Sequence, residues 1–325
     1  MTFVRSKCDQ IRSKSLNPRS DLVLLPIVDV ECRSVAVVNH RDMTALPGTQ
    51  ECPHLRYPGS LGSHLRDQFG MTKMTVGQSP AWETASVRVT AFQKAPIDLH
   101  GLSWWKFMTG SDPESTNIRV GAGQLQESGT VEGTNVALSV LPNRIDWTIS
   151  PKDDAEKGGF GSLGDFAAAS HSVSAMIAKW LPQAPALNRL AFGAQLVVPA
   201  NDQVAAMRIV SGMLDFIKID WTGLRDFTFQ ANRPKSTAIL PDMEPFNRVV
   251  KFQAIVRKRV LATFGTEPPP PIATTSEQNA AYCELDFSTA VPTNPQAELP
   301  RENLEKLLNA LVESAKDAVL KGDWL

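Results

Sequence analysis

Beyond the first 80 residues, apolar and polar side chains alternate with the period of two that is typical of half-buried strands. In 85–92 the valines lie on one face, and an arginine and a threonine lie on the other. The segments 135–140 and 144–149 each place three large apolar residues on one face, and a turn at 141–143 predicts a tight hairpin between them. With a further strand expected at 124–131, this region predicts an antiparallel meander.

The clearest helical pattern lies near the C-terminal end of the chain. Pro300 suits a first helical turn and Gly322 suits a helix end, and between them apolar residues recur at steps of three and four. This stripe consists of Leu304, Leu307, Leu308, Leu311, Ala315, Ala318 and Val319. We therefore expect a long helix that packs on a sheet through the stripe.

Three other helices are expected. The helix at 162–181 ends at two nearby prolines. Its apolar stripe consists of Phe166, Ala169, Val173, Ile177 and Trp180. Another helix follows Asn201 or Asp202, since either residue can cap it. It is expected to turn four residues toward the core, namely Val204, Met207, Ser211 and Leu214. A short helix is expected at 103–108.

Further strands are expected in the second half of the chain. They cover 190–198, 216–221, 226–231, 246–264 and 281–289. The strands come in runs, and the helices stand between the runs rather than after each strand. This order favours an α+β fold over a doubly wound parallel fold. We therefore expect mainly antiparallel sheet with helices packed on one face.

Residues 1–80 differ from the rest of the chain, because they show no sustained period. We expect them to form an irregular N-terminal extension that is either disordered or loosely ordered. The α+β domain then covers 81–325, and it can divide into two subdomains near 185–200. Four side chains of the extension have zinc-compatible chemistry: Cys32, Cys52, His54 and His64. Their spacing contains no two tight pairs, so we expect no metal site.

Composition narrows the classes of protein. Hydrophobic residues make up 42% of the chain, and 33 basic against 34 acidic residues leave a net charge of -1. These values exclude a disordered chain, a collagen-like chain and a polyelectrolyte that binds nucleic acid by bulk charge. No window approaches the roughly 20 apolar residues that a membrane span needs. Four cysteines without a C-x-x-C pair, and no apparent export signal, indicate the cytoplasm.

Familiar catalytic motifs are missing from the sequence. The segment 159–164 matches G-x-G-x-x-G and precedes a helix. The preceding strand ends too early, however, and no acidic residue follows the next strand, so we interpret the glycines as a loop before a helix. No nucleophile elbow, H-E-x-x-H motif or phosphate loop occurs. We therefore expect no cofactor.

The strand expected at 246–264 has one apolar and one basic face. The basic face carries Lys251, Arg257 and Arg259. Such a row can bind a phosphate backbone or an acidic partner. Alternatively, Glu284 and Asp286 share one face of the expected partner strand and can neutralise the row. Both interpretations stay open.

These patterns favour a soluble binding or accessory subunit without a catalytic motif. It would work through contacts with a protein partner or a second copy of itself, with nucleic acid as another partner class and no membrane. The alternative is a hydrolytic enzyme, for example one acting on nucleic acid. Its weak catalytic candidates are Asp98, His100, Glu284 and Asp286, of which the first two form a potential acid–base pair.

Overall fold

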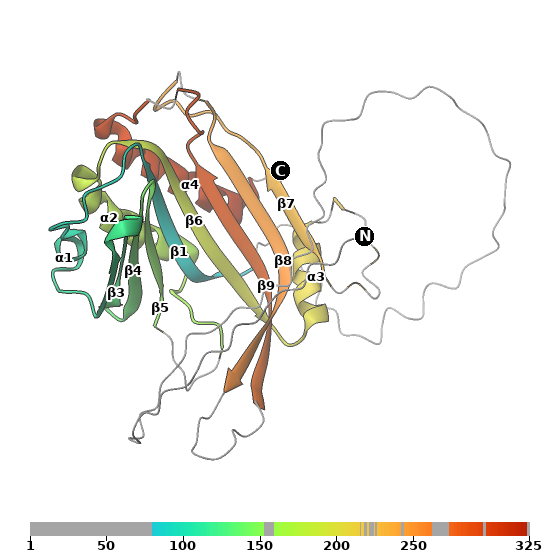
Figure 1. Cartoon of the computed structure of the whole chain (residues 1–325). Helices are drawn as coiled ribbons and strands as arrows, with labels where there is room; N and C mark the ends of the chain where they lie inside the picture. The colour runs from blue at the N-terminus through green and yellow to red at the C-terminus, as the bar shows by residue number, and fades with distance from the viewer. Residues whose placement is uncertain are drawn as a thin grey trace, which may run out of the picture. The chain divides into compact units, whose positions relative to one another are not determined.

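The computed structural model describes residues 80–152, 159–214, 216–217, 220, 224, 226–241, 244–261, 273–294 and 297–323. In this part of the chain nine strands form one sheet in the order β2-β3-β4-β5-β1-β6-β9-β8-β7, and every pair of neighbours is antiparallel. Helices accompany the sheet (Figure 1). The predicted α+β class with mainly antiparallel sheet is confirmed. The extension predicted at 1–80 lies outside the described residues up to position 79.

The first half of the fold is a strand, a helix, a meander and a helix. Its elements are β1 (Glu83–Gln93), α1 (Trp104–Thr109), β2 (Ser115–Arg119), β3 (Gln124–Val131), β4 (Thr134–Leu141), β5 (Arg144–Pro151) and α2 (Phe166–Trp180). The meander and the hairpin are therefore confirmed. Between β3 and β4, Glu132 and Gly133 both have positive φ, at 48° and 81°. Such a two-residue turn matches the twist of the strands that it joins.

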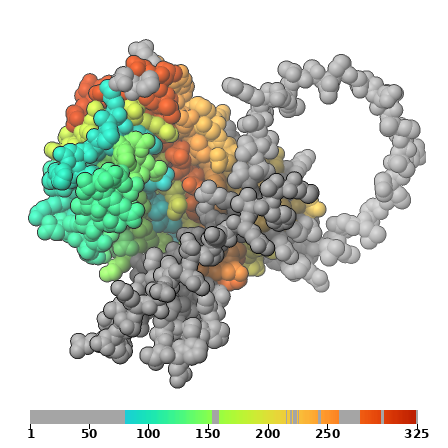
Figure 2. Space-filling model, in the orientation of Figure 1, coloured from blue at the N-terminus to red at the C-terminus, as the bar shows by residue number. Residues whose placement is uncertain are grey.

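The second half repeats this order. Its elements are β6 (Leu187–Ala200), α3 (Gln203–Met213), β7 (Thr228–Asn232), β8 (Asn247–Leu261), β9 (Ala273–Ser288) and α4 (Leu304–Lys321). The first strands of the two halves, β1 and β6, pair with each other at the centre of the sheet. In the space-filling view the green and cyan first half and the orange β7–β8 region lie on opposite sides (Figure 2).

Two expected strands differ from the observed ones. The described residues of 216–221 are not in a strand, and the others of that segment lie outside the described residues. Strand β9 begins at Ala273 rather than at 281, because it pairs with β8 far beyond the end of its pairing with β6. Local alternation could not reveal this extra length.

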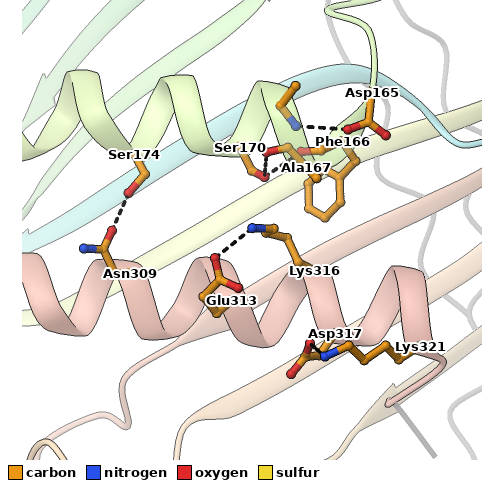
Figure 3. Close-up of polar contacts among 11 residues, drawn as sticks. Asp165, Phe166, Ala167, Ser170, Ser174, Asn309, Glu313, Lys316, Asp317 and Lys321 are labelled. Atoms are coloured by element: carbon orange, nitrogen blue, oxygen red, sulfur yellow. Dashed lines mark hydrogen bonds and ion pairs between the residues drawn. The ribbon is translucent and has the colours of Figure 1, made fainter.

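Helices α2 and α4 pack on one face of the sheet and on each other (Figure 3). All seven residues of the predicted α4 stripe are buried, as are all five of the α2 stripe. Ser174 of α2 donates a hydrogen bond of 2.8 Å to the side-chain oxygen of Asn309 of α4. Asp165 caps α2 by accepting from the backbone N–H of Ala168 at 3.0 Å. Both helical predictions are confirmed.

The predicted inward face of α3 is partly wrong. Val204 is 60% exposed, whereas Ala206 and Val210 are buried beside the expected Met207 and Leu214. The Asp202 carboxylate accepts from the N–H of Ala205 and sets the start of the helix. The helix contacts β8, β9 and β6 through the face that carries the buried residues, and Val204 falls on the outer side.

Glu127 is an acidic side chain on the face that the helices cover. It lies opposite Leu138 of β4, which is buried on that face, and Glu127 itself is 9% exposed. Its Oε2 atom has no hydrogen-bond partner within the described part of the chain. Burial therefore raises the pKa of the Glu127 carboxyl above its ordinary value.

The Glu127→Gln variant is expected to be more stable than the wild type at pH ~7, by about 1 kcal/mol. The folded chain holds the Glu127 proton more tightly than the unfolded chain, so wild-type stability falls as pH rises through the raised pKa. The difference should nearly vanish near pH ~3, below the ordinary glutamate pKa, where the carboxyl is neutral in both states. Urea unfolding at both pH values measures it. Glu305→Gln, at an exposed position of α4, is the control, and a destabilised E127Q protein at pH ~7 would contradict the expectation.

Candidate functional site

The candidate site lies on the face of the sheet that is turned away from α2 and α4 (Figure 1). Residues directly opposite each other in antiparallel strands share a face, so the register defines its members. We call this face the polar face. Its central residues are Arg88, Thr90 and Phe92 of β1, Arg144 and Asp146 of β5, Arg189, Ala191 and Gly193 of β6, Glu284, Asp286 and Ser288 of β9, and Lys251 of β8.

The structure brings together part of the predicted basic row and its predicted acidic partners. Lys251 lies opposite Glu284, and its Nζ atom is 3.4 Å from Oε2 of that residue. Arg257 lies opposite Gln278 instead and has no ion pair with a described residue. Asp286 lies opposite Val249 and Gly193. Of the described side chains in the predicted basic row, Lys251 is therefore the one that is neutralised by a predicted acidic partner.

Arg259, the third member of the predicted row, is placed only through its backbone. It lies opposite Ser276 in the β8–β9 ladder. Its side chain is outside the described part of the structure.

Asp98 and His100 lie in the segment between β1 and α1, and both are exposed. The Asp98 carboxylate accepts a hydrogen bond of 2.9 Å from the backbone N–H of His100. This contact stabilises a local turn, and within the described ranges no carboxylate is hydrogen-bonded to the imidazole. Within the described residues, no hydrogen bond joins this pair to Glu284 or Asp286.

Sequence analysis missed a partly buried ion pair on the polar face. Arg144 Nε lies 2.6 Å from Oδ2 of Asp146, and Arg144 Nη2 donates to Oδ1 at 2.8 Å. The Thr90 hydroxyl donates to the same Oδ1 at 2.5 Å. Asp146 is 8% exposed, so this carboxylate is fully engaged by its two partners. The period-two pattern placed Arg144 and Asp146 on one face, but only the β1–β5 register adds Thr90.

Phe92 lies between two guanidinium groups. The Cζ atoms of Arg189 and Arg144 are 4.8 Å and 5.9 Å from its ring centroid, and both residues lie opposite Phe92 on the flanking strands. Arg189 Nη2 also donates a hydrogen bond of 2.8 Å to the hydroxyl of Ser288. These contacts hold the Arg189 guanidinium on the β6–β9 side of the polar face.

Arg88 packs over Gly193. A Cβ atom at Gly193 would lie 3.7 Å from Nη2 of Arg88 and 3.3 Å from the carbonyl oxygen of Leu285. A Cβ atom would be in ordinary van der Waals contact with the guanidinium, so only a longer side chain at Gly193 would displace Arg88. Because Arg88 and Gly193 are directly opposite in the β1–β6 ladder, the contact depends on that register.

The glycines of 159–164 have a packing role. A Cβ atom at Gly161 would lie 2.6 Å from Cγ of Pro151, and Gly159 and Gly164 have positive φ. The loop also pairs with the start of β1, because Thr84 N donates to the carbonyl of Gly164. These contacts explain the glycines without a bound phosphate.

Other kinds of site receive little support from the described residues. They contain no group of three or more His, Cys, Asp or Glu side chains that could hold a metal ion. None of their helices combines the length and the apolar character needed to cross a bilayer. A pocket of about 390 Å³ lies between the segments 240–244 and 290–300, and its acidic side chains are Glu244 and Glu298.

Comparison with protein families and curated sequences gives no relative. No protein-family model matches the chain, and no curated protein matches its sequence. A functional proposal for the chain therefore depends on the contacts and charges of the polar face.

Proposed function

We propose that this protein works by binding, and that its polar face contacts an acidic region of a protein partner. The observation that carries the proposal is an excess of basic side chains without carboxylate partners. Arg144 and Lys251 have such partners. Arg88, Arg189 and Arg257 form no ion pair with any residue in the described ranges.

An acidic protein fits this face better than single-stranded nucleic acid does. Proteins that bind single strands stack bases on free aromatic rings between their basic residues. Phe92 lies at the centre of the arginine cluster, but two guanidinium groups already cover its ring. Electrostatic complementarity between charged surfaces needs no such stacking. Nucleic acid is therefore an outcome of the test below.

A hydrolytic activity finds no comparable support. It would require Asp98 and His100 to act together with Glu284 and Asp286. The first two are exposed in a turn, and the Asp98 carboxylate caps that turn. Glu284 is paired with Lys251 in the middle of the sheet. We therefore propose binding rather than hydrolysis.

Fluorescence anisotropy with a labelled poly-glutamate peptide tests the proposal. The wild type is expected to bind the peptide at about 50 mM salt and to lose affinity as salt rises, because the attraction is electrostatic. Replacing Arg88, Arg189 and Arg257 together by glutamine is expected to weaken binding at least about tenfold, at roughly 0.5 to 1 kcal/mol per lost contact, because these three side chains carry the excess positive charge. The matched control replaces Lys179, Arg208 and Lys306, which are exposed on α2, α3 and α4.

Two results would contradict the proposal: no wild-type binding at about 50 mM salt, or equal weakening in both triple variants. A labelled oligonucleotide is titrated in parallel. If it binds more tightly than the peptide, nucleic acid is the partner class instead. The triple variant should then flatten the dependence of log affinity on log salt by roughly 2 to 3 units, at about 0.7 to 0.9 per phosphate contact.

A further inference from the structure

Two guanidinium groups of the polar face have unused hydrogen-bonding capacity. Arg88 and Arg189 stand on the neighbouring central strands β1 and β6. The Nε atom of each is buried and has no hydrogen-bond partner in the described structure. A buried Nε atom is closed to a ligand, so an anion would be held by the outer Nη atoms. There Arg88 has no hydrogen bond with a described residue, and Arg189 has one, to Ser288.

The two guanidinium groups point to the same stretch of the sheet. Arg88 lies over Gly193, which is opposite Asp286 of β9. Arg189 reaches Ser288, two residues further along β9. Residues two apart on one strand are about 7 Å from each other, so both groups approach one short section of the β6–β9 border.

The floor between the two arginines is small and rigid. It is formed by Thr90 and Ala191, which are opposite each other and are 2% and 6% exposed. Thr90 is tied to Asp146, and the Phe92 ring packs against Arg189. The Arg189 guanidinium, held by Phe92 and Ser288, therefore loses little further freedom when it binds an anion.

The charge of this cluster is not balanced. Arg88, Arg144 and Arg189 face one engaged carboxylate, that of Asp146. Asp286 is the next carboxylate by register, and it forms no ion pair with a described residue. Half-buried cations without a paired anion are unfavourable, so the cluster favours a bound counter-ion.

We propose that Arg88 and Arg189 together bind a phosphate group. A phosphate dianion offers oxygens in several directions and two negative charges, which suits two guanidinium donors on adjacent strands. The proposal rests on the proposed function in that the polar face is a binding surface. It specifies the anion, which is either a phosphate of a small molecule or a phosphorylated side chain of the partner.

Thermal unfolding of the full chain in inorganic phosphate tests the site. At a constant ionic strength of about 0.1 M, phosphate is expected to raise the melting temperature of the wild type more than chloride does. Arg88→Gln and Arg189→Gln should each weaken phosphate binding about tenfold or more, since a charge-assisted contact is lost. Asp286→Asn should tighten binding, because a like charge beside Gly193 disappears.

Control variants keep the test decisive. Lys306→Gln and Lys179→Gln each remove one exposed charge on a helix, away from the polar face, and both should retain phosphate binding. If the Arg189→Gln protein does not fold, Arg189→Lys is used, which keeps the charge but loses the planar fork of donors. The lysine variant and Arg88→Gln should both bind phosphate more weakly than the wild type.

The inference is overturned if phosphate stabilises the wild type no more than chloride does. It is also overturned if Arg88→Gln and Arg189→Lys bind phosphate like the wild type, because the ion then binds elsewhere. A peptide that binds only when a serine is phosphorylated would identify a partner-borne phosphate, whereas binding of inorganic phosphate alone would indicate a small molecule. If the wild type binds phosphate but not poly-glutamate, the proposed function is refuted and the phosphate site still stands.

Discussion

Replacing Leu308 by aspartate is expected to lower the free energy of unfolding by about 3 kcal/mol or more. Leu308 has 0% exposure in the middle of the apolar stripe of α4, which packs against α2, β6 and β9. The variant loses the packing of a leucine and places a carboxylate without a partner in an apolar environment. Both effects act in the same direction.

Urea unfolding followed by circular dichroism measures this loss. Leu320→Asp is the matched control, because Leu320 belongs to the same helix but is 49% exposed. The control should change stability by less than about 1 kcal/mol. A soluble Leu308→Asp protein with wild-type stability would mean that α4 is detached from the sheet in solution, available to a partner.

Replacing Asp323 by alanine is expected to cost about 2 to 3 kcal/mol, less than a fully buried pair because Asp323 is partly exposed. Arg248 of β8 is 3% exposed, and its Nη2 atom lies 3.2 Å from Oδ2 of Asp323. The same nitrogen donates to the Asp323 carbonyl oxygen, and Lys235 Nζ lies 2.9 Å from Oδ2. Without the carboxylate, the buried Arg248 guanidinium loses its compensating charge.

The free energy of unfolding lost in the Asp323→Ala variant should depend on pH in the opposite sense to the effect of Glu127. The hydrogen bond from Lys235, with help from the Arg248 charge, lowers the pKa of the Asp323 carboxyl. Its stabilising effect is therefore present above the ordinary aspartate pKa and is lost as pH falls through the lowered pKa. Unfolding measured from pH ~7 to ~3 should show a shallower acid dependence in the variant.

A control isolates the buried partner of Asp323. Asp112→Ala removes a carboxylate whose partner is the well-exposed Lys106, so it should cost less than about 1 kcal/mol. If Asp323→Ala costs no more than Asp112→Ala, then water reaches Arg248 after the substitution and the ion pair has little structural importance.

The sequence by itself was sufficient for the class of fold and for most of its elements. The hairpin at 135–149 and the α4 stripe have strong periods, and such periods depend on which neighbours along the chain share a face. The errors occurred where a longer-range contact decides. The inward face of α3 depends on its contacts with β8 and β9, and the length of β9 depends on β8.

In the candidate site too, local patterns predicted one contact and missed those that join distant strands. Alternation correctly placed Lys251 and Glu284 on matching faces of two strands, and the structure joins them at 3.4 Å. It could not place Arg88 beside Gly193 or Arg189 beside Phe92, because β1 and β6 are separated by about 100 positions. Local alternation does not determine which strands become neighbours in the sheet.

What the sequence determined is therefore the face on which each side chain of a strand or helix lies, since backbone geometry sets those periods. The order and register of strands were decided only in the tertiary structure, where burial of both apolar surfaces selects one pairing. That pairing puts β1 between β5 and β6. It thereby collects Arg88, Arg144 and Arg189 from three separate strands into one cluster, whose charges exceed those of the carboxylates beside them.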